Sequence, residues 1–117
     1  MLRDLTYVLD MLIATRHIQA YMAGIDRSMF EQDTLRQDAI IRRIDIVGEA
    51  ARRISAEFRA AHPDIPWQQM ADMRNRLIHG YDEVSLTIVW DVIQHDIPTS
   101  TAQLQSLIPP DEPDESE

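Results

Sequence analysis

The sequence contains neither cysteine nor lysine, and both absences narrow what the protein can do. Without cysteine, the chain can form no disulfide, no thiolate zinc site and no cysteine nucleophile. Its 117 residues are enough for one domain that folds without such cross-links. Without lysine, all 11 basic residues are arginines, whose planar guanidinium groups suit bidentate contact with phosphate or carboxylate. A bias in the base composition of the gene explains this pattern equally well.

Positive charge is also scarce, since the formal net charge is -9. This net charge argues against a protein that binds nucleic acid through a generally basic surface, because neutralising phosphates requires a positive face. The charge is uneven, however: five of the 20 acidic residues follow Pro110, so the rest of the chain carries -4. We therefore expect one folded domain over residues 1–108 and a disordered acidic tail over residues 109–117.

Long apolar runs and alternating runs are both missing. The apolar residues near the N-terminus are interrupted by Asp10 and Arg16, which fits neither a signal peptide nor a membrane span. The sequence therefore predicts a soluble, cytoplasmic protein. No stretch alternates for long enough to predict a sheet.

Apolar residues recur at helical spacing in the first half of the chain. The first helix is predicted from about residue 2 to 23, with Gly24 as its stop. A polar connection follows, with capping-box patterns at residues 28–31 and 34–37. The second of these patterns should begin the longest helix, whose apolar face continues over residues 35–58.

The second half is divided by proline and glycine. A third helix is predicted over residues 67–78, with Gly80 as its terminator. A fourth begins near Ser85, and Pro98 should kink or break it. Any helix that resumes must end before Pro109. Helices joined by short connections predict an all-α fold, a four- to five-helix up-and-down bundle.

Residues 74–81 carry the chemistry that the sequence offers. A histidine such as His79 has an ordinary pKa of about 6.5 and can remove the proton of an RNA 2′-hydroxyl near neutral pH. An arginine such as Arg74 can stabilise the charge that grows on the phosphate, and no metal is needed. Asn75 could hold the histidine tautomer or donate to a phosphate oxygen, and Tyr81 could contact phosphate or stack on a base. A plain capping histidine at a helix end is the structural alternative.

Helix geometry leaves the assembly of such a site open. On an ideal helix Arg74 and His79 would lie about 140° apart, whereas Arg76 and His79 share a face. Either the helix distorts near His79, or the site combines residues of two chains. Glu49 is a candidate buried partner for Arg74 or Arg76, although a solvated acid is the commoner fate of such a residue.

The pattern Arg74-x4-His79-x-Tyr81 resembles the R-x4-6-H-x-Y signature of HepT-like HEPN toxins. The surrounding segments resemble the same family in the same order, at residues 46–51, at 62–67, at 73–75, and at 89–90 together with 96–98. The likeness covers nearly the whole chain except the acidic tail. Four ordered blocks are far more specific than the short signature by itself.

This resemblance implies an all-α HEPN bundle that forms a homodimer, in which two copies of the motif approach each other. It implies a metal-independent endoribonuclease with Arg74 and His79 as the catalytic pair, to which we add Asn75, Arg76 and Glu49 as supporting residues. Such a protein would be the toxin of a type VII (HepT/MntA) toxin–antitoxin system.

The resemblance also implies a partner, a minimal nucleotidyltransferase of the MntA type. This antitoxin neutralises the toxin by transferring AMP from ATP to the tyrosine of the motif, here Tyr81. The chain itself is expected to need no cofactor or metal, because ATP and Mg²⁺ serve the partner. Two alternatives stay open: a non-catalytic HEPN partner and substrate of the nucleotidyltransferase, and a purely structural helical dimer.

Overall fold

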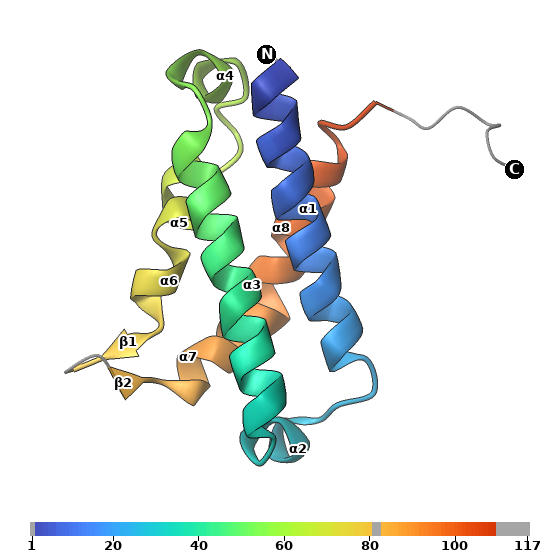
Figure 1. The fold of residues 1–117 in the computed structure, drawn as a ribbon, viewed down its shortest axis with the longest axis vertical. Helices are drawn as coiled ribbons and strands as arrows, with labels where there is room; N and C mark the ends of the chain where they lie inside the picture. Colours follow the sequence, from blue (N-terminus) through green and yellow to red (C-terminus); the bar gives the residue numbers. More distant parts are fainter. Residues whose placement is uncertain (1, 81–82, 110–117) are drawn as a thin grey trace, which may run out of the picture.

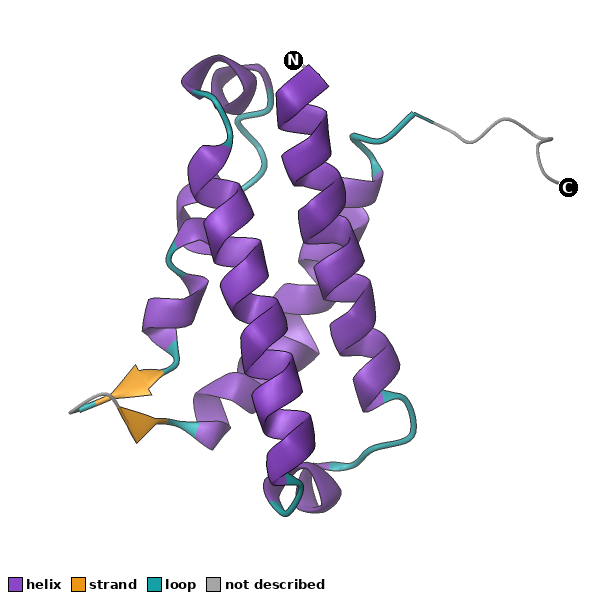
Figure 2. Ribbon diagram, viewed as in Figure 1, coloured by secondary structure: helices purple, strands orange, loops and turns teal. Residues whose placement is uncertain are grey.

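The computed structural model describes residues 2–80 and 83–109 and is almost entirely helical (Figures 1 and 2). Its helices are α1 (Leu2–Met22), α2 (Arg27–Glu31), α3 (Thr34–Arg53), α4 (Ala56–Ala61), α5 (Trp67–Ala71), α6 (Met73–Arg76), α7 (Leu86–Asp91), the π-helix η1 (Val92–Asp96) and α8 (Ile97–Gln105). Two short strands, β1 (Ile78–His79) and β2 (Glu83–Val84), form a hairpin. The all-α bundle predicted from the sequence is confirmed.

Helices α1 and α3 lie side by side and run in opposite directions, and α8 packs against α1 (Figure 1). Their facing sides carry fully buried apolar residues, such as Met11 and Ile18 on α1 and Ile40 and Ile44 on α3. The predicted extent of the first helix is confirmed. Gly24 follows it with φ +75°, a left-handed conformation that suits glycine at a helix end.

The capping residues of the next two helices differ from those predicted. Asp26 accepts a hydrogen bond from the Met29 N–H at the start of α2, and Asp33 accepts one from the Arg36 N–H at the start of α3. Asp26 lies two residues before Ser28, and Asp33 directly precedes Thr34, which are the residues that matched the capping-box pattern. Aspartate is as good an N-cap as serine, so the short pattern could not choose between them.

The longest helix was predicted to continue to Phe58, and this is wrong. Helix α3 ends at Arg53, the next residue is extended, and Ser55 caps the separate helix α4. Asp4 of α1 holds the break: its carboxylate accepts bonds from the Ser55 N–H (2.7 Å) and the Ser55 hydroxyl (2.8 Å). Phe58 is still buried, so the apolar spacing continues across the change in direction of the chain.

Helix α5 packs closely on α3 at Gly48. A Cβ atom at this position would lie 3.2 Å from the carbonyl oxygen of Ala71, so glycine permits the close approach. One turn later, Arg52 donates from Nη1 to the same carbonyl oxygen at 2.7 Å. These contacts fix α5, and with it the following helix α6, on the side of α3.

The third predicted helix is interrupted and shorter than expected. It breaks at Asp72, resumes as α6 and ends at Arg76. Residues 78 and 79 then pair with residues 84 and 83 in an antiparallel register, a pair of two-residue strands that the search for alternating runs did not predict. The Ser85 N–H donates to the Leu77 carbonyl at 2.8 Å and closes the hairpin against the helix end.

Pro98 does not break the last helical segment. Helix α7 passes into η1, and α8 begins one residue before the proline, which is at the second helical position. In η1 the Ile97 N–H donates to the Val92 carbonyl, a wider turn than in an α-helix. The irregularity therefore lies just before the proline.

In the described ranges, no helix is long and apolar enough to cross a membrane. The tail predicted to be disordered lies outside the described residues from residue 110 onward.

Candidate functional site

The motif segment covers the end of α6 and the first strand of the hairpin. Arg74 lies on α6, whereas His79 belongs to β1. Of the two explanations for the angular spread of the motif, the first is therefore realised: the helix has ended before His79, and the angles of an ideal helix do not apply. Gly80 follows with φ +73°; it belongs to the hairpin turn and does not terminate a helix.

The structure does not describe the side chains of two predicted site residues. The structure describes the backbone of His79 but not its side chain, and Tyr81 lies outside the described residues. The backbone of His79 pairs with Glu83 in the antiparallel register. The predicted catalytic histidine therefore belongs to a strand that begins two residues after the end of α6.

Arg74 is oriented by an acidic residue of α3. Its Nε lies 2.9 Å from Oδ1 of Asp45, and its side chain is about one-third exposed, at 34%. Its Nη1 is buried and has no hydrogen-bond partner among the described residues. A guanidinium carries five N–H donors, so one ion pair leaves others for a further acceptor. Arg74 is therefore held in place with unused donors, as phosphate binding requires.

Arg76 points to a different element. Its Nη1 pairs with Oδ2 of Asp96 at the end of η1, and its side chain is 43% exposed. The sequence placed Arg74 and Arg76 together in one site. The structure pairs one with α3 and the other with η1, so the two arginines face different neighbours. Asn75, between them, is exposed.

Glu49 is not the partner of either motif arginine. It is exposed and pairs with Arg52 (3.5 Å) and Arg53 (3.6 Å) on its own helix. The acid that contacts Arg74 is Asp45, one turn earlier on α3. Sequence reasoning missed it, because residues four apart share a face of a helix and the spacing could not choose between them. It missed Asp96 as well, for which no spacing rule gives a signal.

Metal-ligating residues do not gather anywhere in the described part of the chain. No group of three or more histidine, aspartate or glutamate side chains there could hold a metal ion. The candidate site therefore consists of an oriented arginine, a second arginine nearby in sequence, and the histidine hairpin.

Fold and motif define the class as an all-α, HEPN-like helical bundle. The family model described as "Ribonuclease HepT-like" matches residues 11–107, which include α3, α6 and the entire hairpin. The chain belongs to this HepT-like ribonuclease family.

Several relatives match along most of their length. A probable ribonuclease HepT of Thermococcus cleftensis is 36% identical over 101 residues, covering 86% of this chain and 92% of the relative. An inferred RNase of Methanocaldococcus jannaschii is 32% identical over 92 residues, covering 79% and 84%. A further inferred RNase, of Caldanaerobacter subterraneus, is 35% identical over 85 residues, covering 73% and 76%. No solved structure matches the chain significantly.

Proposed function

We propose that this protein is a metal-independent endoribonuclease and the toxin of a HepT/MntA-type toxin–antitoxin pair in the cytoplasm. The observation that carries the proposal is the family match, which includes the whole Arg74-x4-His79-x-Tyr81 segment. The ion pair between Arg74 and Asp45 supports it, because it holds an arginine with unused donors directly before the hairpin that contains His79.

The proposed reaction is an internal transesterification of RNA. His79 removes the proton of a 2′-hydroxyl, and the 2′-oxygen attacks the adjacent phosphorus. The bond from phosphorus to the 5′-oxygen breaks, and this leaving oxygen takes up a proton. The products are a 2′,3′-cyclic phosphate and a 5′-hydroxyl. Arg74 donates to the phosphate oxygens and stabilises the negative charge of the transition state. Asn75 and Arg76 are supporting residues in this scheme.

Cleavage of RNA by the purified protein is the direct test. We expect cleavage in the presence of a chelator and none by His79→Ala, with circular dichroism showing that the variant keeps its helices. RNA that stays intact with the wild-type protein, or cleavage retained by His79→Ala, would refute the catalytic assignment. The first of these results, combined with modification of Tyr81, would favour the non-catalytic partner of a nucleotidyltransferase.

Regulation by AMP transfer to Tyr81 is the second part of the proposal. The other tyrosines are poor acceptors, because Tyr7 and Tyr21 are half-buried and the Tyr21 hydroxyl accepts a bond from Arg43 Nε at 3.2 Å. An added phosphodiester carries negative charge, and beside Arg74 it would compete with the RNA phosphate.

Intact-mass spectrometry tests this regulation. Incubation with the cognate nucleotidyltransferase, ATP and magnesium should add one or more AMP units, and Tyr81→Phe should stay unmodified. Tyr7→Phe serves as the matched control and should be modified like the wild type. An unchanged mass, or modification that persists in Tyr81→Phe, would show that Tyr81 is not the acceptor of AMP.

A homodimer with a composite site is the third part. Light scattering at micromolar concentration should give twice the mass of the chain, and a monomer would contradict it. Mixing Arg74→Ala chains with His79→Ala chains gives a sharper measurement. If each site draws on both chains, the mixture should recover part of the cleavage that both variants lose.

A further inference from the structure

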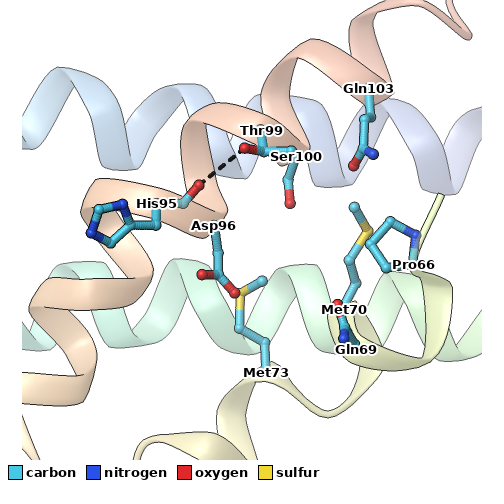
Figure 3. Close-up of a pocket in the computed structure, with 9 residues that line it drawn as sticks. All are labelled: Pro66, Gln69, Met70, Met73, His95, Asp96, Thr99, Ser100 and Gln103. Carbon is cyan, nitrogen blue, oxygen red and sulfur yellow. Dashed lines mark hydrogen bonds between the residues drawn. The ribbon is translucent and has the colours of Figure 1, made fainter. Parts of the chain in front are cut away.

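A pocket of about 220 Å³ lies between helices α5 and α6 on one side and η1 and α8 on the other (Figure 3). One wall is apolar and comes from Pro66, Met70 and Met73. Both methionines are almost fully buried. The opposite wall is polar. The pocket thus has the two unlike walls of a site that fixes both the position and the orientation of a small ligand.

The polar wall offers several hydrogen-bond acceptors. Oε1 of Gln103 is buried and has no hydrogen-bond partner within the described residues. The hydroxyl of Thr99 already donates to the His95 carbonyl at 3.1 Å, so its free lone pairs can only accept. The carboxylate of Asp96 adds a further acceptor. A buried acceptor without a donor is costly, so a ligand that supplies N–H groups would be stabilised here.

The apolar wall favours a flat ring. Thioethers are polarisable and adapt to aromatic surfaces, and two of them form this wall. The buried hydroxyl of Ser100 points into the same space in Figure 3 and can serve a ring edge as donor or acceptor. A planar ring with an exocyclic amino group on one edge matches both walls.

A positive group stands at the edge of this pocket. Arg76 pairs through Nη1 with Asp96, which lines the pocket, and its half-exposed side chain keeps further N–H donors. The ion pair offsets the negative charge of Asp96, which would otherwise repel an anion. An arginine with free donors beside a ring-sized pocket is suited to a ligand that joins a ring to a phosphate.

We propose that this pocket binds the base of a nucleotide that carries an exocyclic amino group, with Arg76 holding the phosphate. The amino group donates to Gln103, and the methionines pack on the ring. Arg76 is also in the motif segment, five residues before Tyr81. As far as the ligand is a base of the RNA substrate, the proposal rests on the proposed ribonuclease function, and the pocket then gives the enzyme a base preference.

Nuclear magnetic resonance with free mononucleotides tests the pocket without any cleavage. Cytidine and uridine monophosphate are matched probes, because they have the same size and differ by an amino group against a carbonyl on the ring. We expect cytidine monophosphate to shift the amide signals of residues 69–73 and 99–103, and uridine monophosphate to bind roughly tenfold more weakly. Equal shifts with both nucleotides, shifts confined to other regions, or no shifts would overturn the proposal.

Gln103→Leu is the informative variant. It removes the unpartnered amide at similar volume, so the melting temperature should stay equal or rise. Gln105→Leu, on the exposed side of α8, is the matched control. We expect roughly tenfold weaker binding of cytidine monophosphate to Gln103→Leu and unchanged binding to Gln105→Leu. If Gln103→Leu binds cytidine monophosphate with wild-type affinity, the Gln103 amide does not contact the ligand and the proposal is overturned.

Cleavage of an RNA pool with randomised sequence distinguishes the source of the base. If the base belongs to the substrate, the wild type should prefer an amino-bearing base at one position near the cut, and Gln103→Leu should lose this preference. Nucleotide binding with an unchanged cleavage pattern would assign the pocket to a free nucleotide. If the wild type cuts no RNA, the proposed function fails, and nucleotide binding still decides whether the pocket exists as a site.

Discussion

The α1–α3 pair and the segment from α5 to β2 are built in different ways. Helices α1 and α3 have 21 and 20 residues and join through continuous buried faces. Helices α5 and α6 have five and four residues, too few for an isolated helix to be stable. The second region depends on tertiary contacts: side chains such as Trp67 and Met70 are buried in the core, and Arg52 donates to the Ala71 carbonyl. The two long helices therefore form the scaffold, and the candidate chemistry lies in the second region.

This division predicts that changes of the partly exposed motif residues in the second region alter activity more than stability. Arg74→Ala should lower RNA cleavage by about 10²- to 10³-fold, because one charge-stabilising donor group is lost. The melting temperature should change little, since the remaining partner, Asp45, is partly exposed and can be hydrated. Cleavage assays and thermal unfolding by circular dichroism measure the two effects. Arg53→Ala, an exposed arginine of α3, is the control and should leave both unchanged.

Equal cleavage by Arg74→Ala and the wild type would contradict the division, as would a large loss of stability. In the second case the ion pair with Asp45 would be part of the scaffold, and the two regions would not be separable.

A change in the first region should have the opposite effect. Ile44 is fully buried on α3, so Ile44→Ala should lower the free energy of unfolding by about 3 kcal/mol. Urea unfolding at matched protein concentration measures this loss. Leu35→Ala on the same helix is the control: its side chain is 84% exposed, and a change within about 0.5 kcal/mol is expected. Cleavage per folded molecule should be retained in both variants. Its loss in Ile44→Ala would show that the core of α3 also determines activity.

Gly48 connects the two regions and should affect both properties. In Gly48→Val the new Cβ would lie 3.2 Å from the Ala71 carbonyl oxygen, so α5 must move away from α3. We expect a loss of about 2 kcal/mol in the free energy of unfolding, together with reduced cleavage, because α6 and Arg74 follow α5. Ala20→Val at an exposed position of α1 is the control for placing a branched residue in a helix. Full activity in Gly48→Val would show that the site tolerates movement of α5.

The sequence predicted the first region well, because burial leaves a periodic pattern. The extent of α1, its stop at Gly24 and the burial of Ile40 and Ile44 on α3 all follow from apolar spacing and glycine chemistry. The break after α3 does not, since it depends on a contact between Asp4 and Ser55, which are 51 positions apart. The spacing of apolar residues predicts which side chains are buried, but it does not predict where one helix ends and the next begins.

In the second region the sequence predicted the motif residues but not the secondary structure that carries them. The motif residues were found by spacing, yet the strands and the split of the helix were not, because two-residue strands leave no alternating pattern. The partner of Arg74 was also missed: Asp45 and Glu49 lie on one face of α3, and only the position of α6 selects Asp45. Ion pairs between distant elements depend on packing that a single sequence does not encode locally.

The smallest expected effect concerns Asp4, whose polar contact with Ser55 joins α1 to the start of α4. The hydrogen bond from the Ser55 N–H holds the pKa of the Asp4 carboxyl below its usual value; burial opposes this shift and the Ser55 hydroxyl adds to it. Because the pKa is lower in the folded protein, the ionised carboxylate stabilises the fold above the unfolded-state value of about 3.9. This contribution is lost as the pH falls through the folded-state pKa.

Asp4→Asn should therefore lower the melting temperature by a few degrees at pH 7, and the difference from the wild type should shrink as the pH falls below about 4. Thermal unfolding followed by circular dichroism over this pH range measures it. Asp10→Asn, an exposed position on the same helix, is the control and should show no such pH-dependent difference. If the difference for Asp4→Asn were the same at every pH, the carboxylate charge would not be what holds Ser55. The turn between α3 and α4 would then depend on shape and neutral hydrogen bonds alone.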